Sequence, residues 1–388
     1  MAETRDIFLV CNNVEELGGL QRWAHDIGRL FAARGHRVHL VGITHADRPH
    51  DYGRDLPYTV TVLHERQPAP ARGPLGDRLR TLRHRRMVRR GAARLSALFR
   101  TARSGGVVIA AQVWAMEWVA RADTAGMPVI GMSHESYEAT RRSSRYERVK
   151  RHFADADLLL ALTDADADAW AFDGMSNAAA MPNPLHVTPR TVSPRTEPVV
   201  VRHGRLSFEK GQDMLLESWA EVASRHPSWR LRLYGSGPED AALREQAAGL
   251  GLSGSVEFAG PTSDIESALT GASIFALSSR EEGFPMSIIE AMAYGLPTVA
   301  FDCAPGVSEL LTDGRDGLIV SPGNTAEFAA ALDRLIRDAG LRDSLAEAAR
   351  ESVRRYEPDA ILDRWERQFA LVAGGKDRAV PPRAVAAR

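Results

Sequence analysis

Short apolar runs alternate along this chain with segments in which apolar residues recur at every third or fourth position. In the first half, Leu20, Trp23, Ile27 and Phe31 show the helical spacing, and the pattern stops before Gly35. Apolar runs flank this segment and recur after it, so we predict strands over residues 7–11, 38–41, 107–111, 129–132 and 158–162. A strand, a helix and a strand in such close succession form a βαβ unit, which implies a parallel sheet and a right-handed crossover.

The alternation stops over residues 182–198, where Pro189, Pro194 and Pro198 occur among few apolar residues. It resumes with predicted strands over residues 199–203, 231–234, 256–259, 274–276, 298–300 and 317–320. We therefore expect an α/β protein with one domain over residues 1–185 and a second over residues 186–373. In open α/β folds ligands bind at the carboxyl ends of the strands, so a cleft between the two domains is the expected site. Residues 374–388 show no periodicity and are expected to be disordered.

The size and composition of the chain agree with two folded domains. Its 388 residues exceed what one hydrophobic core usually supports, and 44% of them are hydrophobic. The net charge of -1 argues against a general nucleic-acid-binding protein. The two cysteines, Cys11 and Cys303, indicate no disulfide framework and favour a reducing cytoplasm. No segment has the pattern of a secretory leader, and Gln112 and Glu117 interrupt the longest apolar stretch, so we expect no membrane-spanning helix.

Two carboxylates flank the start of a predicted helix in the second half of the chain. Glu282 precedes Gly283, whose missing side chain lets a ligand approach the backbone, and Pro285 suits the first turn of a helix. Glu290 follows eight residues after Glu282, about two turns along the same helix. Because the free N–H groups of a helix start favour an anion, this arrangement suits a ligand that carries both phosphate and hydroxyl groups.

The stretch SREEGFPMSIIEAMAYGLPTVAFD resembles the E-x7-E signature of the retaining family 4 glycosyltransferases, which have the two-domain GT-B fold. The resemblance covers most of the chain and is strongest over residues 204–320. It implies two doubly wound Rossmann-like domains that face a central cleft, the first binding the acceptor and the second the nucleotide sugar. By the same resemblance, Glu290 holds the ribose hydroxyls, while Glu282 contacts the transferred sugar and stabilises its developing positive charge.

Arg205 and Lys210 lie on a glycine-flanked turn after the predicted strand 199–203. Two cations at this spacing can reach one diphosphate, since arginine offers a planar fork of donors and lysine a compact charge. A solvated pair at a strand end is the plainer interpretation. The family resemblance favours the diphosphate-binding interpretation. It implies that both residues bind the leaving diphosphate and act in catalysis.

Glycines mark further turns that a nucleotide sugar could approach. Gly18 and Gly19 open the first predicted helix, and Gly235 and Gly237 follow the strand 231–234. Each pair alone is weak evidence, because a simple turn also uses glycine. Together with the start of the acidic helix they complete the predicted donor-binding set, which consists of Gly18, Gly19, Arg205, Lys210, Gly235, Gly237, Gly283, Phe284, Pro285, Met286 and Glu290.

His134 comes directly after the predicted strand 129–132, where its side chain would face the cleft. A histidine that caps the strand end is an equally ordinary explanation. In the family that the chain resembles, a histidine at this strand end hydrogen-bonds the donor sugar. We therefore add His134 to Glu282, Arg205 and Lys210 as a predicted catalytic residue.

Asp164, Asp166 and Asp168 have the spacing of a metal-binding run. Ala169 and Met175, however, occupy the positions at which a calcium loop requires glycine and glutamate. The aspartates fit the first turn of a helix instead, where acidic side chains are favoured. We predict no metal and no other cofactor, with the nucleotide sugar as a co-substrate.

Eleven arginines and a single acid, Asp77, occur within residues 72–103, which begin with Arg72 and end with Arg103. Residues 141–151 add a second basic cluster. Basic side chains with apolar ones between them suit an anionic acceptor or a peripheral contact with a membrane surface. A solvated helix face explains the pattern equally well.

These patterns and the resemblance predict a retaining, metal-independent glycosyltransferase of the hexosyltransferase class. It would move a hexose or an N-acetylhexosamine from a nucleotide diphosphate sugar, with UDP expected from the family, to a hydroxyl of a glycan, a lipid-linked sugar or a small molecule. The leaving diphosphate would accept the proton of the acceptor in a front-face reaction. The alternatives are a nucleotide-sugar epimerase of the same fold and an inactive module that binds a glycan or a nucleotide sugar. A cytoplasmic protein is expected, at the inner face of the membrane if the basic segment binds there.

Overall fold

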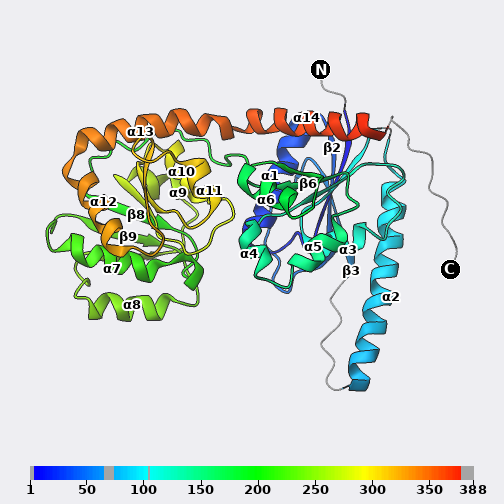
Figure 1. Cartoon of the computed structure of the whole chain (residues 1–388), viewed down its shortest axis with the longest axis horizontal. Helices are drawn as coiled ribbons and strands as arrows, with labels where there is room; N and C mark the ends of the chain where they lie inside the picture. Colours follow the sequence, from blue (N-terminus) through cyan, green and yellow to red (C-terminus); the bar gives the residue numbers. More distant parts are fainter. Residues whose placement is uncertain (1–3, 65–73, 104, 377–388) are drawn as a thin grey trace. The chain divides into compact units, whose positions relative to one another are not determined.

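The computed structural model describes residues 4–64, 74–103 and 105–376, and of residues 74–80, 375 and 376 it describes the backbone alone. The chain divides into two compact units, one made of Met1–Met181 with Leu362–Arg388 and the other of Pro182–Ile361. Each unit contains one parallel sheet whose strands alternate with helices along the chain (Figure 1). The predicted α/β class with two doubly wound domains is therefore confirmed.

Over the described residues, the sheet of the first unit has seven strands in the order β3-β2-β1-β4-β5-β6-β7. The strands are β1 (Asp6–Cys11), β2 (Arg37–Thr44), β3 (Thr59–His64), β4 (Val107–Ala110), β5 (Val129–Met132), β6 (Leu158–Ala161) and β7 (Ala178–Ala180). The helices are α1 (Gly19–Ala33), α2 (Pro74–Phe99), α3 (Val113–Val119), α4 (Tyr137–Arg141), α5 (Tyr146–His152) and α6 (Asp164–Phe172).

In the described part of the second unit, six strands lie in the order β10-β9-β8-β11-β12-β13. They are β8 (Val199–His203), β9 (Arg230–Tyr234), β10 (Val256–Gly260), β11 (Ile274–Leu277), β12 (Thr298–Phe301) and β13 (Gly317–Val320). The helices are α7 (Gln212–Ala223), α8 (Asp240–Gly249), α9 (Ile265–Thr270), α10 (Met286–Ala293), α11 (Pro305–Leu310), α12 (Thr325–Arg337) and α13 (Ala339–Val353). The last helix, α14 (Pro358–Lys376), belongs to the first unit from Leu362 onwards. Short 3-10 turns cover Phe208–Lys210 and Arg354–Tyr356.

The strand order reverses at one point in each sheet, between β1 and β4 in the first unit and between β8 and β11 in the second. At such a point the chain leaves two neighbouring strands in opposite directions, and open α/β sheets bind their ligands there. In the second unit the loops that leave this point begin with Gly204 and with Ser278. The fold therefore brings the predicted cations and the predicted acidic pair to one edge of one sheet.

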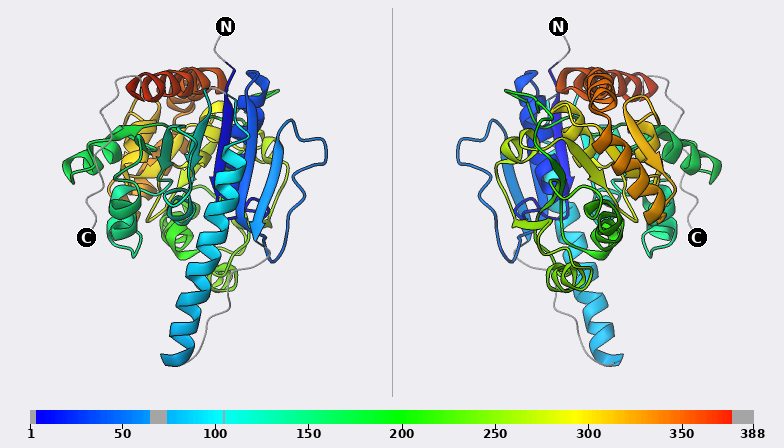
Figure 2. Two further views of the ribbon diagram at one scale, coloured as in Figure 1. Left: turned by 90° about the vertical axis from the view of Figure 1, so that its right-hand side faces the viewer. Right: turned by 90° about the vertical axis from the view of Figure 1, so that its left-hand side faces the viewer.

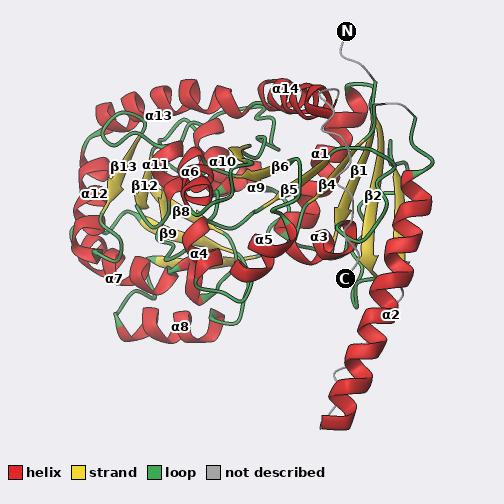
Figure 3. Ribbon diagram, turned by 45° about the vertical axis from the view of Figure 1, so that its right-hand side comes forward, coloured by secondary structure: helices red, strands yellow, loops and turns green. Residues whose placement is uncertain are grey.

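Among the described side chains of α2, those that are buried against the first unit lie in the second half of the helix. Val88, Leu95 and Phe99 are buried, and the Phe99 ring meets the Phe8 ring of β1 edge to face at 5.2 Å. The first turns of the helix project away from the rest of the first unit (Figure 2, Figure 3).

The end of the chain corrects the expected domain boundary at residue 373. Beyond Leu362, α14 packs in the first unit, where Trp365 and Phe369 contact Phe31 of α1 at centroid distances of 5.6 and 5.7 Å. The apolar face of an amphipathic helix indicates that the helix is buried, but it does not indicate which sheet the helix packs against. From the sequence pattern alone, α14 was therefore assigned to the second domain. The helix continues to Lys376, three residues into the expected disordered tail, and residues 377–388 lie outside the described part.

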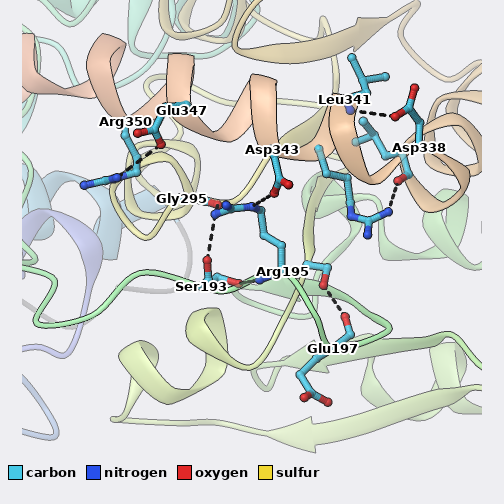
Figure 4. A network of polar contacts seen from close by, with 12 residues as sticks. Ser193, Arg195, Glu197, Gly295, Asp338, Leu341, Asp343, Glu347 and Arg350 are labelled. Atoms are coloured by element: carbon cyan, nitrogen blue, oxygen red, sulfur yellow. Dashed lines mark hydrogen bonds and ion pairs between the residues drawn. The ribbon is translucent and has the colours of Figure 1, made fainter.

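The proline-rich segment over residues 182–198, where the predicted alternation stops, belongs to the second unit. Arg195, which has a φ of 56°, donates from Nη1 to the carbonyls of Ser193 and Gly295 at 2.8 and 3.1 Å. Its Nε donates to Asp343 of α13 at 2.8 Å (Figure 4). A left-handed backbone at a residue other than glycine costs about 1–3 kcal/mol, and these hydrogen bonds offset that cost.

Among the described residues, no helix is both long enough and apolar enough to cross a membrane.

Candidate functional site

The loops after β8 and β9 are joined through their backbones. Leu206 N donates to the carbonyl of Ser236 at 3.0 Å, and Gly204 N donates to that of Tyr234 at the same distance. A Cβ on Gly235 would lie 1.9 Å from the carbonyl oxygen of Gly204, and one on Gly237 would lie 2.0 Å from that of Leu206. Both glycines are thus required by this loop contact, which fixes the turn that carries Arg205.

The two predicted diphosphate cations lie on this turn in different surroundings. The Arg205 side chain is exposed, and among the described residues it has no hydrogen-bond partner. Its carbonyl accepts a hydrogen bond from Gln212 Nε2 at 2.8 Å, which holds the backbone of the turn. Lys210 is half-buried and its Nζ lies 2.8 Å from each carboxylate oxygen of Glu282. The structure therefore brings Lys210 and Glu282 into direct contact.

Glu290 lies buried on α10 between two imidazoles. His186 Nε2 lies 2.9 Å from Oε1, and His203 Nε2 lies 3.0 Å from Oε2 in an orientation that does not meet hydrogen-bond geometry. Burial raises the pKa of Glu290, but the two imidazoles outweigh burial and hold that pKa well below its usual value. The second predicted carboxylate is therefore an anion with fixed neighbours.

Fewer groups around the start of α10 are available to a ligand than the sequence suggested. Pro285 is the residue before the first helical one, not part of the first turn, and no described side chain caps the helix. Phe284 is 6% exposed and its ring packs edge to face on Tyr356 at 5.5 Å. What remains for a ligand is the backbone of Gly283 and the first N–H groups of the helix, which begins at Met286.

In the first unit, His134 lies beside α1. Its ring meets Trp23 edge to face at 4.5 Å, and its Nε2 is buried without a partner among the described residues. Burial lowers the pKa of His134 to about 4, so the imidazole is neutral at neutral pH. A buried ring nitrogen without a partner carries a desolvation cost, which a bound hydroxyl group would relieve.

Gly18 and Gly19 lie at the start of α1 in the same unit. Gly18 is the residue before the helix and has an extended backbone, so its conformation does not require glycine. A Cβ on Gly19 would meet nothing within 4 Å, which leaves space beside the first turn. The predicted set is thus divided, with these glycines and His134 in the first unit and all other members in the second.

Sequence reasoning missed four polar residues that surround the two predicted carboxylates, namely His186, Arg202, His203 and Ser279. Arg202 and His203 interrupt the otherwise apolar strand VVVRH immediately before Gly204. Two charged or polar residues in a buried strand could have indicated that these side chains belong to a binding site. Nothing in the sequence pairs His186 or Ser279 with an acid.

The aspartate run starts a helix, as predicted. Thr163 caps α6 by accepting from Asp166 N at 3.0 Å, and Asp166 accepts from Thr163 Oγ1 and from Tyr137 N at 2.7 and 2.8 Å. Both oxygens of the Asp166 carboxylate therefore accept hydrogen bonds from groups of the protein itself. In the part of the chain that the structure describes, no three histidine, cysteine, aspartate or glutamate side chains form a group that could hold a metal ion.

Two family models match overlapping stretches of the chain, which together run from residue 17 to residue 352. The model described as Glycosyltransferase Family 4 matches residues 17–194, and that described as Glycosyl transferases group 1 matches residues 188–352. The chain belongs to the family 4, group 1 glycosyltransferases. The cations and the acidic pair of this glycosyltransferase lie inside the group 1 match, and Gly18, Gly19 and His134 lie inside the family 4 match.

An exopolysaccharide phosphotransferase of Streptomyces coelicolor is 34% identical to this glycosyltransferase over 272 residues. That match covers 69% of the chain but 28% of the relative, so the chain spans under a third of that curated protein.

Two solved structures share its fold. A mutant of TarM from S. aureus, in complex with UDP and other ligands, has a TM-score of 0.75 at 14% identity, covering 94% of this chain and 100% of that one. HepE of Anabaena, in complex with UDP and glucose, has a TM-score of 0.72 at 21% identity, covering 96% and 100%. The predicted GT-B fold of this glycosyltransferase is confirmed.

The neutral state of His134 predicts how stability depends on pH. The unfolded chain binds a proton at this histidine below about pH 6.5, whereas the folded chain does so only below about pH 4. Stability therefore falls as the pH falls through this window, by up to about 3 kcal/mol from this group alone. Chemical denaturation of the parent and of His134→Gln at pH 7 and pH 4.5 measures it. The variant should lose clearly less stability than the parent, whereas the exposed His50→Gln should lose as much as the parent.

Proposed function

We propose that this glycosyltransferase moves a hexose or an N-acetylhexosamine from a UDP-sugar to an acceptor hydroxyl, with retention of the anomeric configuration and without a metal. The observation that carries the proposal is the charge arrangement after β8 and β11. Two buried carboxylates, Glu282 and Glu290, lie in the same unit as an exposed arginine and a half-buried lysine. A nucleotide diphosphate sugar carries hydroxyl groups for the acids and a diphosphate for the cations.

The donor class is also supported by proteins with the same fold. The TarM structure contains UDP and α-GlcNAc-glycerol, and the HepE structure contains UDP and glucose. Both are under 25% identical to this chain, so they support UDP as the first nucleotide to test and do not decide the sugar.

In the proposed reaction each side chain has a separate task. Arg205 and Lys210 bind the diphosphate, together with the N–H groups at the start of α10, and stabilise the charge that grows on it. Glu290 accepts hydrogen bonds from the ribose, and Glu282 accepts from the sugar. Because Lys210 contacts Glu282 already, the bound diphosphate has to share this lysine.

The bond from the anomeric carbon to the diphosphate oxygen breaks as the acceptor oxygen bonds to the same face of that carbon. The acceptor proton passes to the departing diphosphate, so the products are the glycoside and UDP. The role proposed for His134 is a hydrogen bond to the donor sugar. A neutral imidazole suits it, since a cation would oppose the positive charge that develops on the sugar.

Removing either cation should reduce turnover strongly. We expect Arg205→Ala and Lys210→Ala to lower kcat about 100- to 1,000-fold, because each loses a contact that strengthens as the diphosphate leaves. Initial rates of UDP release from a panel of UDP-sugars measure this effect. Arg315→Ala, an exposed arginine elsewhere in the second unit, is the control and should keep the parent rate. Rates within a few-fold of the parent in both site variants would contradict the assignment.

Turnover should not depend on a divalent metal. The proposed site neutralises the diphosphate with Arg205, Lys210 and backbone N–H groups, so we expect equal rates in EDTA and in magnesium or manganese. Complete loss of UDP release in EDTA, restored by manganese, would overturn this part of the proposal.

We also propose that the projecting part of α2 contacts an anionic partner, either the acceptor or a membrane surface. Arg83, Arg85, Arg86 and Arg89 are all exposed, and no described acid pairs with them. The second basic cluster, residues 141–151, differs, because five of its cations have acidic partners, among them Arg145 with Glu135 and Arg148 with Glu117. Arg72 and Asp77, within the same basic segment, lie where the structure describes no side chain.

Replacing Arg83, Arg85, Arg86 and Arg89 together by glutamine should weaken binding to the anionic partner and leave UDP-sugar hydrolysis unchanged. Binding by the parent should also fall as salt rises, since exposed charges are screened within about 8 Å at physiological ionic strength. Sedimentation with vesicles that contain anionic lipid tests the membrane, and the acceptor KM tests the acceptor.

The control replaces four exposed arginines of the second unit, Arg315, Arg334, Arg337 and Arg354. If the α2 variant and the control behave alike in both assays, the basic segment is a solvated helix face.

A further inference from the structure

Arg202 is a buried cation to which neither the sequence pattern nor the proposed reaction gives a role. It is the fourth residue of β8, and only 2% of its surface is exposed. A guanidinium in such a place is costly unless hydrogen bonds and counter-charges compensate it. Burial lowers the pKa of Arg202, and the negative charges of Glu282 and Glu290 act against that lowering without cancelling it.

The hydrogen bonds of Arg202 lead to Glu282 through one serine. Nη1 donates to the carbonyl of His203, and Nη2 donates to Ser279 Oγ at 3.2 Å. Ser279 Oγ lies 2.7 Å from Glu282 Oε1. Ser279 is itself 1% exposed, so no bulk water competes for its hydroxyl group.

The direction of this relay is fixed by the available protons. A guanidinium only donates, and a serine hydroxyl has one proton. Since Ser279 accepts from Arg202, its own proton goes to Glu282 Oε1. That oxygen also accepts from Lys210 Nζ, so both of its lone pairs are used, whereas Oε2 accepts from Lys210 alone. The oxygen of Glu282 with acceptor capacity left is Oε2.

We propose that Arg202 and Ser279 are positioning residues for Glu282, which lock its carboxylate so that Oε2 receives a hydroxyl of the donor sugar. This inference rests on the proposed function, in which Glu282 contacts the sugar. Glu290, the proposed ribose contact, is held by a separate pair, His186 and His203. Loss of the serine relay should therefore impair recognition of the sugar and spare the nucleotide.

The test compares Ser279→Ala with the parent by calorimetric titration of UDP and by the kinetics of UDP-sugar hydrolysis. We expect the Kd for UDP to stay within about twofold and kcat to fall about 10- to 100-fold. A loss of UDP affinity as large as the loss of kcat would overturn the inference, as would an unchanged kcat. Ser218→Ala is the matched control, because Ser218 is equally buried in the second unit but its hydroxyl donates only to a backbone carbonyl, that of Met214.

A double-mutant cycle shows whether Ser279 acts through Glu282. If it does, Ser279→Ala should add less than twofold to the loss of kcat already caused by Glu282→Gln. Full additivity would mean an independent structural effect and would overturn the inference. Arg202→Lys gives a second test if Ser279→Ala does not fold. Two different nitrogens of the planar guanidinium donate to His203 O and Ser279 Oγ, and a lysine has a single nitrogen that cannot occupy both positions, so kcat should again fall while UDP binding persists.

The proposed function and this inference fail in different ways. A parent protein that neither binds UDP nor hydrolyses any UDP-sugar refutes the proposed function, and the positioning role with it. A parent that does both, with Ser279→Ala indistinguishable from it, refutes the positioning role alone.

Discussion

Burial of charge at the carboxyl ends of β8 and β11 is the constraint on which the second unit depends. Glu282, Glu290 and Arg202 each lose most of their hydration there, and each is compensated by neighbours that the strand order brings together. Lys210 and Ser279 compensate Glu282, and two imidazoles compensate Glu290. Such groups are expensive to keep for stability alone, and their concentration at one sheet edge is typical of a binding site.

Backbone geometry makes this arrangement possible. The loop that carries Arg205 is fixed by contacts so close that Gly235 and Gly237 leave no room for a side chain. Gly211, with a φ of 61°, turns the chain so that Lys210 ends one short helix and α7 begins; its Cβ would lie 2.0 Å from the carbonyl of Ser278. The turns after β8, β9 and β11 thus support one another, and Lys210 reaches Glu282 as a result. Loop packing therefore requires glycine at these three positions, whether or not a ligand also approaches Gly235 and Gly237 as predicted from the sequence.

The sequence predicted strands that are buried on both faces, because β1, β4, β8 and β12 each contain at least three consecutive apolar residues. It missed β3, whose first three residues are exposed at the sheet edge, and β7, which consists of three alanines. The cations and acids of the proposed site were predicted from their order along the chain and from the family resemblance. His186 and Ser279 were not predicted as part of the site, because only the tertiary fold shows which acid each one contacts. The destination of α14 was missed for the same reason, since an amphipathic helix does not encode its partner.

The proposed donor site depends most directly on Glu290 as an ionised, fixed acceptor for the ribose. Isothermal titration of UDP into the parent and into Glu290→Gln measures this dependence, with thermal melting to confirm that the variant is folded. Charge-assisted hydrogen bonds contribute about 1.5–3 kcal/mol, so the account predicts that the variant binds UDP about 10- to 100-fold more weakly. Equal affinity of the two folded proteins for UDP would contradict it.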